Sequence, residues 1–136
     1  GWVLLHDPVP AILQVQRLDV VDAQGRQRVV LGVTQHNDGS ILVNNRSGAQ
    51  IVSAGGVTDG TGRLTLRDTT DQDRVQLGAA GHYGTGGAVV VLNTKGRVAI
   101  ALTPDAGGNG LVQGCVDHAP QSICKSMWLG DVVEGR

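Results

Sequence analysis

The chain has 136 residues, a formal net charge of −1 and only 17% charged residues, so its length corresponds to one domain. Its even mixture of basic and acidic side chains excludes the basic surface of a nucleic-acid-binding protein, and no apolar stretch approaches the roughly 18 residues of a membrane-spanning helix. The apolar residues are mainly Val, Leu, Ile and Ala, with 21 Gly and no Phe, which predicts strands around a narrow core.

Residues 1–17 are predicted to be a lead-in that docks on a partner or on the end of the fold. Pro8 and Pro10 exclude a regular strand or helix at their positions, whereas the segment AILQVQR at 11–17 fits a first strand or a short helix. Trp2 lies in the apolar cluster WVLL and is the side chain that we expect to contact a partner, because indoles are favoured anchors of interfaces.

Residues 18–113 contain a degenerate repeat. Its four copies read LDVVDAQGRQRVVLGV, ILVNNRSGAQIVSAGG, LTLRDTTDQDRVQLGA and VVVLNTKGRVAIAL. Each copy has an Asp or Asn before its turn, at Asp22, Asn45, Asp68 and Asn93, which gives steps of 23, 23 and 25 residues. A constant period in this range indicates one supersecondary unit copied several times, and such a unit cannot bury its apolar face alone.

Within each copy, apolar residues alternate with a period of two, as in Leu18 and Val20, which predicts strands. The segment from Asp22 to Gly25 has the chemistry of a type I turn. The four copies therefore predict a meander of about eight short antiparallel strands. The links between copies, TQHNDGS, VTDGTG, AAGHYGTGG and TPDAGGNG, are expected to be loops or wider hairpins.

Residues 114–136 lie outside the repeat and are predicted to cap the fold, with Trp128 as a second contact for a partner. Cys115 and Cys124 are nine positions apart, and a local disulfide is the simplest interpretation. A disulfide implies an oxidising compartment, which favours an extracellular, cell-envelope or virion location. Two unpaired thiols, or a zinc site with His118, are the alternatives, although no fourth zinc ligand is evident.

The motif LxVxDxxGxxRVxLG, followed by a Gly-rich loop, resembles the repeats of fibre-like β proteins of phages and bacteria, including phage tail-fibre shafts. The resemblance covers residues 18–110. It implies that each chain contributes a β-meander and that three chains pack into a triangular prism or an interwoven β-helix. Similar repeats occur in bacterial envelope proteins with an upstream membrane anchor. Because the repeat in such proteins is a scaffold, the resemblance implies no functional residues.

The predicted fold is therefore all-β, a repeated hairpin meander that forms a homotrimeric β-prism or β-helix. A single meander has one apolar face and two open edges, and three copies around an axis would cover the apolar faces. A single-chain β-barrel or β-sandwich is the alternative. We prefer the trimer because barrel interiors usually contain larger side chains than this chain has.

No catalytic, cofactor-binding or metal-binding motif is apparent, so the chain is not expected to be an enzyme. The sequence lacks GxSxG, HxH and HExxH, and the acidic residues Asp59, Asp68, Asp71 and Asp73 fit turns and solvated strands. Four histidines are expected to be exposed without metal, namely His6, His36, His82 and His118. Loop residues that could touch a protein or a surface glycan are Tyr83, Asn37, Asp38 and Asn109.

Three functions follow from these observations. The first is a non-enzymatic structural protein, a β-repeat scaffold in a fibre or surface complex that associates with itself and docks on a larger assembly through its termini and loops. The second is an accessory subunit of a membrane-associated complex, anchored by a segment upstream of Gly1. The third is a carbohydrate-binding or hydrolytic module with its site in the Gly-rich loops.

Overall fold

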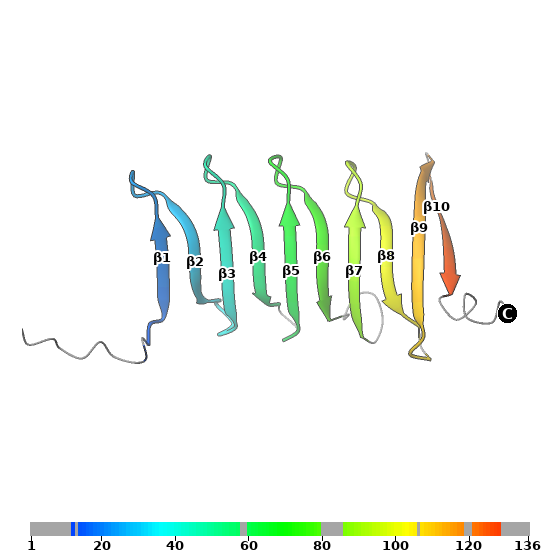
Figure 1. Ribbon diagram of the computed structural model, residues 1–136, viewed down its shortest axis with the longest axis horizontal. Helices are drawn as coiled ribbons and strands as arrows, with labels where there is room; N and C mark the ends of the chain where they lie inside the picture. The colour runs from blue at the N-terminus through cyan, green and yellow to red at the C-terminus, as the bar shows by residue number, and fades with distance from the viewer. Residues whose placement is uncertain are drawn as a thin grey trace, which may run out of the picture.

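The computed structural model describes residues 12, 14–57, 60–79, 86–105, 107–118 and 121–128. These residues form one open sheet of ten antiparallel strands, in which every strand pairs with its neighbours in sequence (Figure 1). The strands are β1 (Arg17–Val21), β2 (Gln27–Val33), β3 (Gly39–Asn44), β4 (Gln50–Gly56), β5 (Gly62–Arg67), β6 (Asp73–Ala79), β7 (Gly87–Leu92), β8 (Val98–Pro104), β9 (Gly110–His118) and β10 (Gln121–Trp128).

The predicted all-β hairpin meander is thus confirmed, with two strands more than the four copies supply. The sheet does not close, because β1 and β10 form its opposite edges (Figure 1). The described strands therefore form neither a single-chain barrel nor a sandwich. None of the described residues belongs to a helix of the length and apolarity that would cross a membrane.

The turns at the upper edge of the sheet in Figure 1 are closed by the backbone hydrogen bond of a β-turn. In the first, the N–H of Gly25 donates to the carbonyl of Asp22 at 2.9 Å, and the N–H of Asp22 donates to the carbonyl of Arg26 at 3.0 Å. Gly25 has a φ of 74°, the left-handed conformation that closes this turn, and a bulge follows Val20 where β1 ends. The same pair of backbone bonds starts at Asn45, Asp68 and Asn93.

Three of the four links between copies use the same tight turn, which corrects the expectation of loops or wider hairpins. The two backbone bonds recur from Thr34, Val57 and Asp105. Asn37 occupies the left-handed position of the first link with a φ of 65°. The fourth link contains residues 80–85, which lie outside the described residues. The structural unit is therefore one strand and one turn, about half the period seen in the sequence.

Two further segments differ from their predictions. Residues 14–16 precede β1 and belong neither to a strand nor to a helix, so the expected first element starts only at Arg17. At the other end, residues 110–118 and 121–128 form the longest hairpin of the sheet, and β9 pairs with β8. The predicted boundary between residues 113 and 114 thus falls inside β9, and β10 is an edge strand.

Candidate functional site

One face of the sheet, here called the apolar face, carries two rows of side chains that run across the strands. Because directly paired residues in antiparallel strands point to the same side, the register defines each row. The lower row crosses all ten strands and consists of Leu18, Leu31, Ile41, Ala54, Leu64, Leu77, Val89, Leu102, Val112 and Met127. The upper row consists of Val20, Val29, Val43, Val52, Leu66, Val75, Val91 and Ile100, and continues to Gly114 and Lys125.

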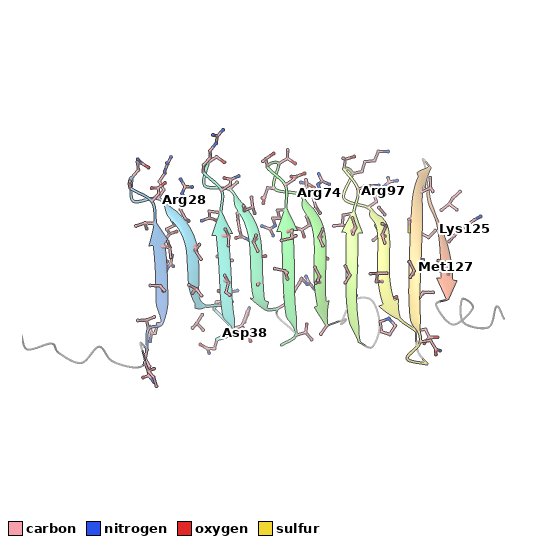
Figure 2. All side chains as sticks on the ribbon, in the orientation of Figure 1. Arg28, Asp38, Arg74, Arg97, Lys125 and Met127 are labelled. Carbon is pink, nitrogen blue, oxygen red and sulfur yellow. A yellow bond between two sulfur atoms is a disulfide. The ribbon has the colours of Figure 1, made fainter. Side chains whose placement is uncertain are left out.

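These apolar rows are exposed in the single chain. Leu31, Leu77 and Leu102 are 38%, 37% and 43% exposed, and Met127 on the edge strand is 55% exposed (Figure 2). A sheet normally buries such a face against a second layer. The described residues supply no second layer, because all their strands belong to one sheet. An apolar surface of this extent is typical of interaction sites.

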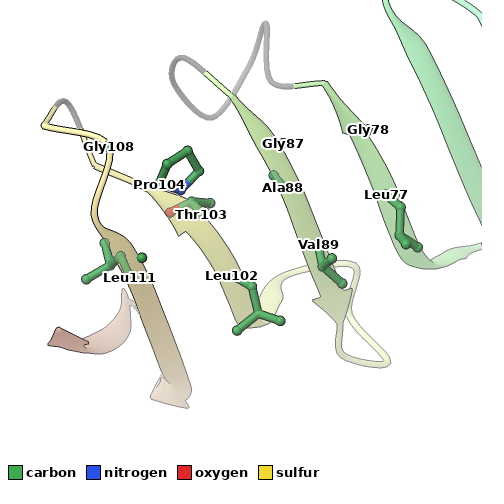
Figure 3. Close-up of a pocket in the computed structure, with 11 residues that line it drawn as sticks. Leu77, Gly78, Gly87, Ala88, Val89, Leu102, Thr103, Pro104, Gly108 and Leu111 are labelled. Carbon is green, nitrogen blue, oxygen red and sulfur yellow. The ribbon is translucent and has the colours of Figure 1, made fainter. Parts of the chain in front are cut away.

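Below the lower row, the apolar face is bounded by glycines. Strands β3, β5, β7 and β9 each begin with one, at Gly39, Gly62, Gly87 and Gly110. Near two of them is a hollow of ≈ 550 Å³ whose lining includes Leu77, Val89 and Leu102 (Figure 3). These three residues belong to the lower row, so the hollow adjoins the apolar face.

The opposite face, here called the polar face, mixes polar and small side chains. Its central row consists of Asp19, Val30, Leu42, Ser53, Thr65, Gln76, Val90, Ala101, Gln113 and Ser126. Four residues of this row are buried, namely Val30, Val90, Ala101 and Thr65. Many of the larger side chains on the apolar face are exposed instead. Burial within the chain is thus concentrated on the polar face, while the larger apolar side chains remain accessible.

The upper turns carry an ionic contact that was not predicted from the sequence. The Nε of Arg28 donates to Oδ2 of Asp22 at 3.0 Å, and its guanidinium also donates to the backbone carbonyls of Asn45 and Arg46 in the next upper turn. Each such contact, here called a clamp, joins two successive hairpins (Figure 2).

A second clamp repeats this geometry. Arg74 donates through Nε to Oδ2 of Asp68 at 2.6 Å and through its guanidinium to the carbonyl of Asn93. The signal in the sequence was an Arg six positions after the Asp in the first and third copies.

Hydrogen bonds within the turns and from the clamps lower the pKa of both carboxyl groups. For Asp22, desolvation raises the pKa, but hydrogen bonds from the Arg26 backbone and from the side chains of Arg28 and Arg26 outweigh it. For Asp68, the Thr70 hydroxyl is the strongest cause of the low pKa, and Arg74 lowers it further against desolvation. Both carboxylates therefore remain charged well below the pH at which a free aspartate is protonated.

The predicted contact residues are described only in part. Trp2 and Tyr83 lie outside the described residues, as do His6 and His82. The backbone of Trp128 ends β10 opposite Leu111. Asn37 and Asp38 occupy the link after β2, and the side chain of Asn109 donates to Asp105 at 3.1 Å.

The remaining candidates that the structure describes lie apart from one another or pair with Arg67. Asp71 and Asp73 both pair with Arg67, and Asp59 lies outside the described residues. His36 lies in a turn, where Nε2 is 3.2 Å from Nε2 of Gln35, and His118 ends the backbone of β9. Among the described residues, no group of three His, Cys, Asp or Glu side chains is arranged to hold a metal ion.

Cys115 and Cys124 are joined in a disulfide across the last hairpin. They are directly paired in the register of β9 and β10, with a Cα–Cα distance of 4.0 Å. The bond fixes β10, the outermost strand, to the sheet.

Comparison with known proteins does not assign the chain to a family. No family model matches the sequence, and no curated protein matches it significantly.

Proposed function

We propose that this chain is a non-enzymatic structural protein, a β-repeat scaffold of a fibre or surface complex that assembles as a homotrimer. The observation that carries the proposal is the apolar face, where a row of apolar side chains crosses all ten strands and many large apolar residues are exposed. Removal of apolar surface from water is the main driving force of association. The occupant that we propose for this face is the same face of two further copies.

The shape of the apolar face supports a prism. At about 4.8 Å per strand, ten strands make a strip roughly 45 Å long, whereas its two rows are only about 7 Å apart. Three long, narrow strips can enclose an axis that runs across the strands. Each row would then contact the same row of the two other chains. At every level along the axis, the core would therefore contain three copies of one residue. Slim Val, Leu and Ile side chains suit such a narrow core.

The ends of the chain support a place in a larger assembly. Trp2 and Trp128 lie near opposite ends of the sequence, and with Tyr83 they are the large aromatic side chains available to anchor a partner. The disulfide between Cys115 and Cys124 supports an oxidising environment, such as the cell envelope or a virion surface. The proposal includes no substrate and no cofactor.

The test is the mass in solution, measured by light scattering on a sizing column. One chain has a mass of 14.1 kDa, so three chains have a mass of 42.3 kDa. Val112→Glu places a charge in the lower apolar row between Leu102 and Met127, and we expect it to dissociate the trimer. Gln113→Glu, on the next residue but the polar face, is the matched control and should keep the trimeric mass.

Circular dichroism distinguishes dissociation from unfolding in these variants. A wild-type mass of 14.1 kDa would overturn the trimer and favour the accessory-subunit alternative. Equal loss of mass in both variants would show that the apolar face has no special role in assembly.

A further inference from the structure

We propose that the polar face carries a binding site for a carboxylate-bearing sugar, such as a uronic acid unit of an acidic polysaccharide. The site is a hollow of ≈ 290 Å³ over β3, β4, β5 and β6, here called the polar trough. The side chains that define it are Ser40, Ser53, Arg63, Thr65, Arg67 and Asp73. This face points away from the apolar face, so the trough is accessible whether or not the trimer forms.

The first observation is a buried hydroxyl without a partner. Thr65 is only 5% exposed, and in the described part of the chain its hydroxyl has no hydrogen-bond partner. A buried polar group that lacks a partner is unfavourable, so native structures rarely retain one without a reason. Thr65 lines the trough, and a hydroxyl of a bound ligand would provide the missing hydrogen bond.

The second observation is an available positive charge on the same strand and face. Arg63 precedes Thr65 by two residues, a spacing of about 7 Å in a strand. Its directly paired neighbours are Gly55 and Gly78, which place no side chains of their own beside it. No carboxylate among the described residues pairs with Arg63.

The end of the trough that contains Arg67 and Asp73 determines which anion fits. There Arg67 is already neutralised, since its Nε donates to Oδ1 of Asp73 at 2.8 Å. Asp73 would repel a doubly charged group such as phosphate more than a singly charged carboxylate. The planar guanidinium of Arg63 matches a carboxylate with two parallel hydrogen bonds.

The remaining lining matches the other groups of a sugar. The hydroxyl-bearing side chain of Ser53 is directly paired with Thr65, and Ser40 is directly paired with Gly55 beside it. Hydroxyl groups can both donate and accept, as the hydroxyls of a sugar require. The volume is at the small end of the range for ligand sites, which suits one monosaccharide unit of a longer chain.

The experiment is an NMR titration of the ¹⁵N-labelled full chain with methyl glucuronide, with methyl glucoside and inorganic phosphate as comparison ligands. We expect saturable shifts at the Ser53 and Thr65 amides with the glucuronide and about tenfold weaker binding of the neutral glucoside, because hydrogen bonds to charged groups are the stronger ones. Arg63→Gln should weaken glucuronide binding about tenfold or more.

Two further variants make the test specific. Arg46→Gln removes one positive charge from an exposed turn outside the trough and should leave the affinity unchanged. Thr65→Val should weaken binding several-fold without loss of thermal stability. The proposal is overturned if the glucuronide causes no saturable shift, if Arg63→Gln and Arg46→Gln behave alike, or if phosphate binds more tightly than the glucuronide.

Discussion

The upper turns of the sheet are of two kinds, and their difference shows how the hairpins are joined. Turns that start with Asp22 and Asp68 have an Arg six residues later, whereas those that start with Asn45 and Asn93 have Ile51 and Ala99 there. The backbone is the same in all four, and in each the Oδ1 atom accepts the N–H groups two and four residues ahead. Only a carboxylate has the second charged oxygen that holds the Arg.

It follows that the repeat alternates between two forms. Asp22 and Asp68 are separated by 46 residues (68 − 22), twice the apparent period. The clamp of Arg28 joins the hairpins of β1–β4, and the clamp of Arg74 joins those of β5–β8. Between β4 and β5 the corresponding residue is Ile51, which cannot form a clamp. We therefore expect this boundary to be a weaker connection than the boundaries that a clamp spans.

Acidification should produce the largest effect, because it acts on both clamps together. The pKa values of Asp22 and Asp68 are depressed in the folded state, while an unfolded aspartate titrates near 3.9. Their stabilising contribution is therefore complete above about pH 4 and is lost as the pH falls below that value toward the folded pKa. Thermal unfolding between pH 7 and pH 2 should show a decrease in Tm that starts near pH 4.

In the double variant Asp22→Asn/Asp68→Asn, all four of these upper turns begin with a neutral Asn. This variant serves as the control. It should have a lower Tm at pH 7 and a smaller change between pH 7 and pH 2 than the wild type. The aspartates of the clamps would not be responsible if the double variant kept the full pH dependence.

Breaking one clamp should have a smaller effect. Arg74→Met removes the guanidinium that joins Asp68 to the carbonyl of Asn93, and we expect Tm to decrease by roughly 5 °C. Ile51→Met changes the corresponding residue of an Asn turn and should alter Tm by less, since similar apolar side chains replace one another at low cost. Differential scanning calorimetry at one protein concentration measures both; equal decreases would contradict a specific role of the clamp.

Much of the fold could be predicted from the sequence, because it depends on local patterns. The alternation around Leu18 and Val20 and the turn chemistry from Asp22 to Gly25 were sufficient for strands and hairpins. The tight links were missed because Asn37 replaces the expected glycine in one of them and because Gly60 and Gly108 appeared within longer polar segments. Each of these residues occupies the left-handed fourth position of its turn, which is the signal that identifies the link.

The clamps and the polar trough were harder to predict, for a different physical reason. Asp22 and Asn45 form the same turn, so the repeat pattern does not distinguish Asp from Asn, although only the charged form holds an Arg. The trough depends on the cross-strand register, which places Gly55 and Gly78 beside Arg63. A period alone does not fix the register.

Adding a third clamp should have the smallest effect. It tests the difference between Asp turns and Asn turns by converting an Asn turn into an Asp turn with its Arg. Asn45→Asp with Ile51→Arg reproduces the pair Asp22 and Arg28 one repeat later, where the new guanidinium can reach the carbonyl of Asp68. We expect a gain in Tm of roughly 2 °C, because an ion pair near the surface contributes little and Ile51 loses apolar contacts. The gain should come with slower hydrogen exchange of amides where β4 pairs with β5. Each single variant supplies only half of the clamp, so a double variant no more stable than the sum of the two single effects would show that the alternation of turns is not what joins the hairpins.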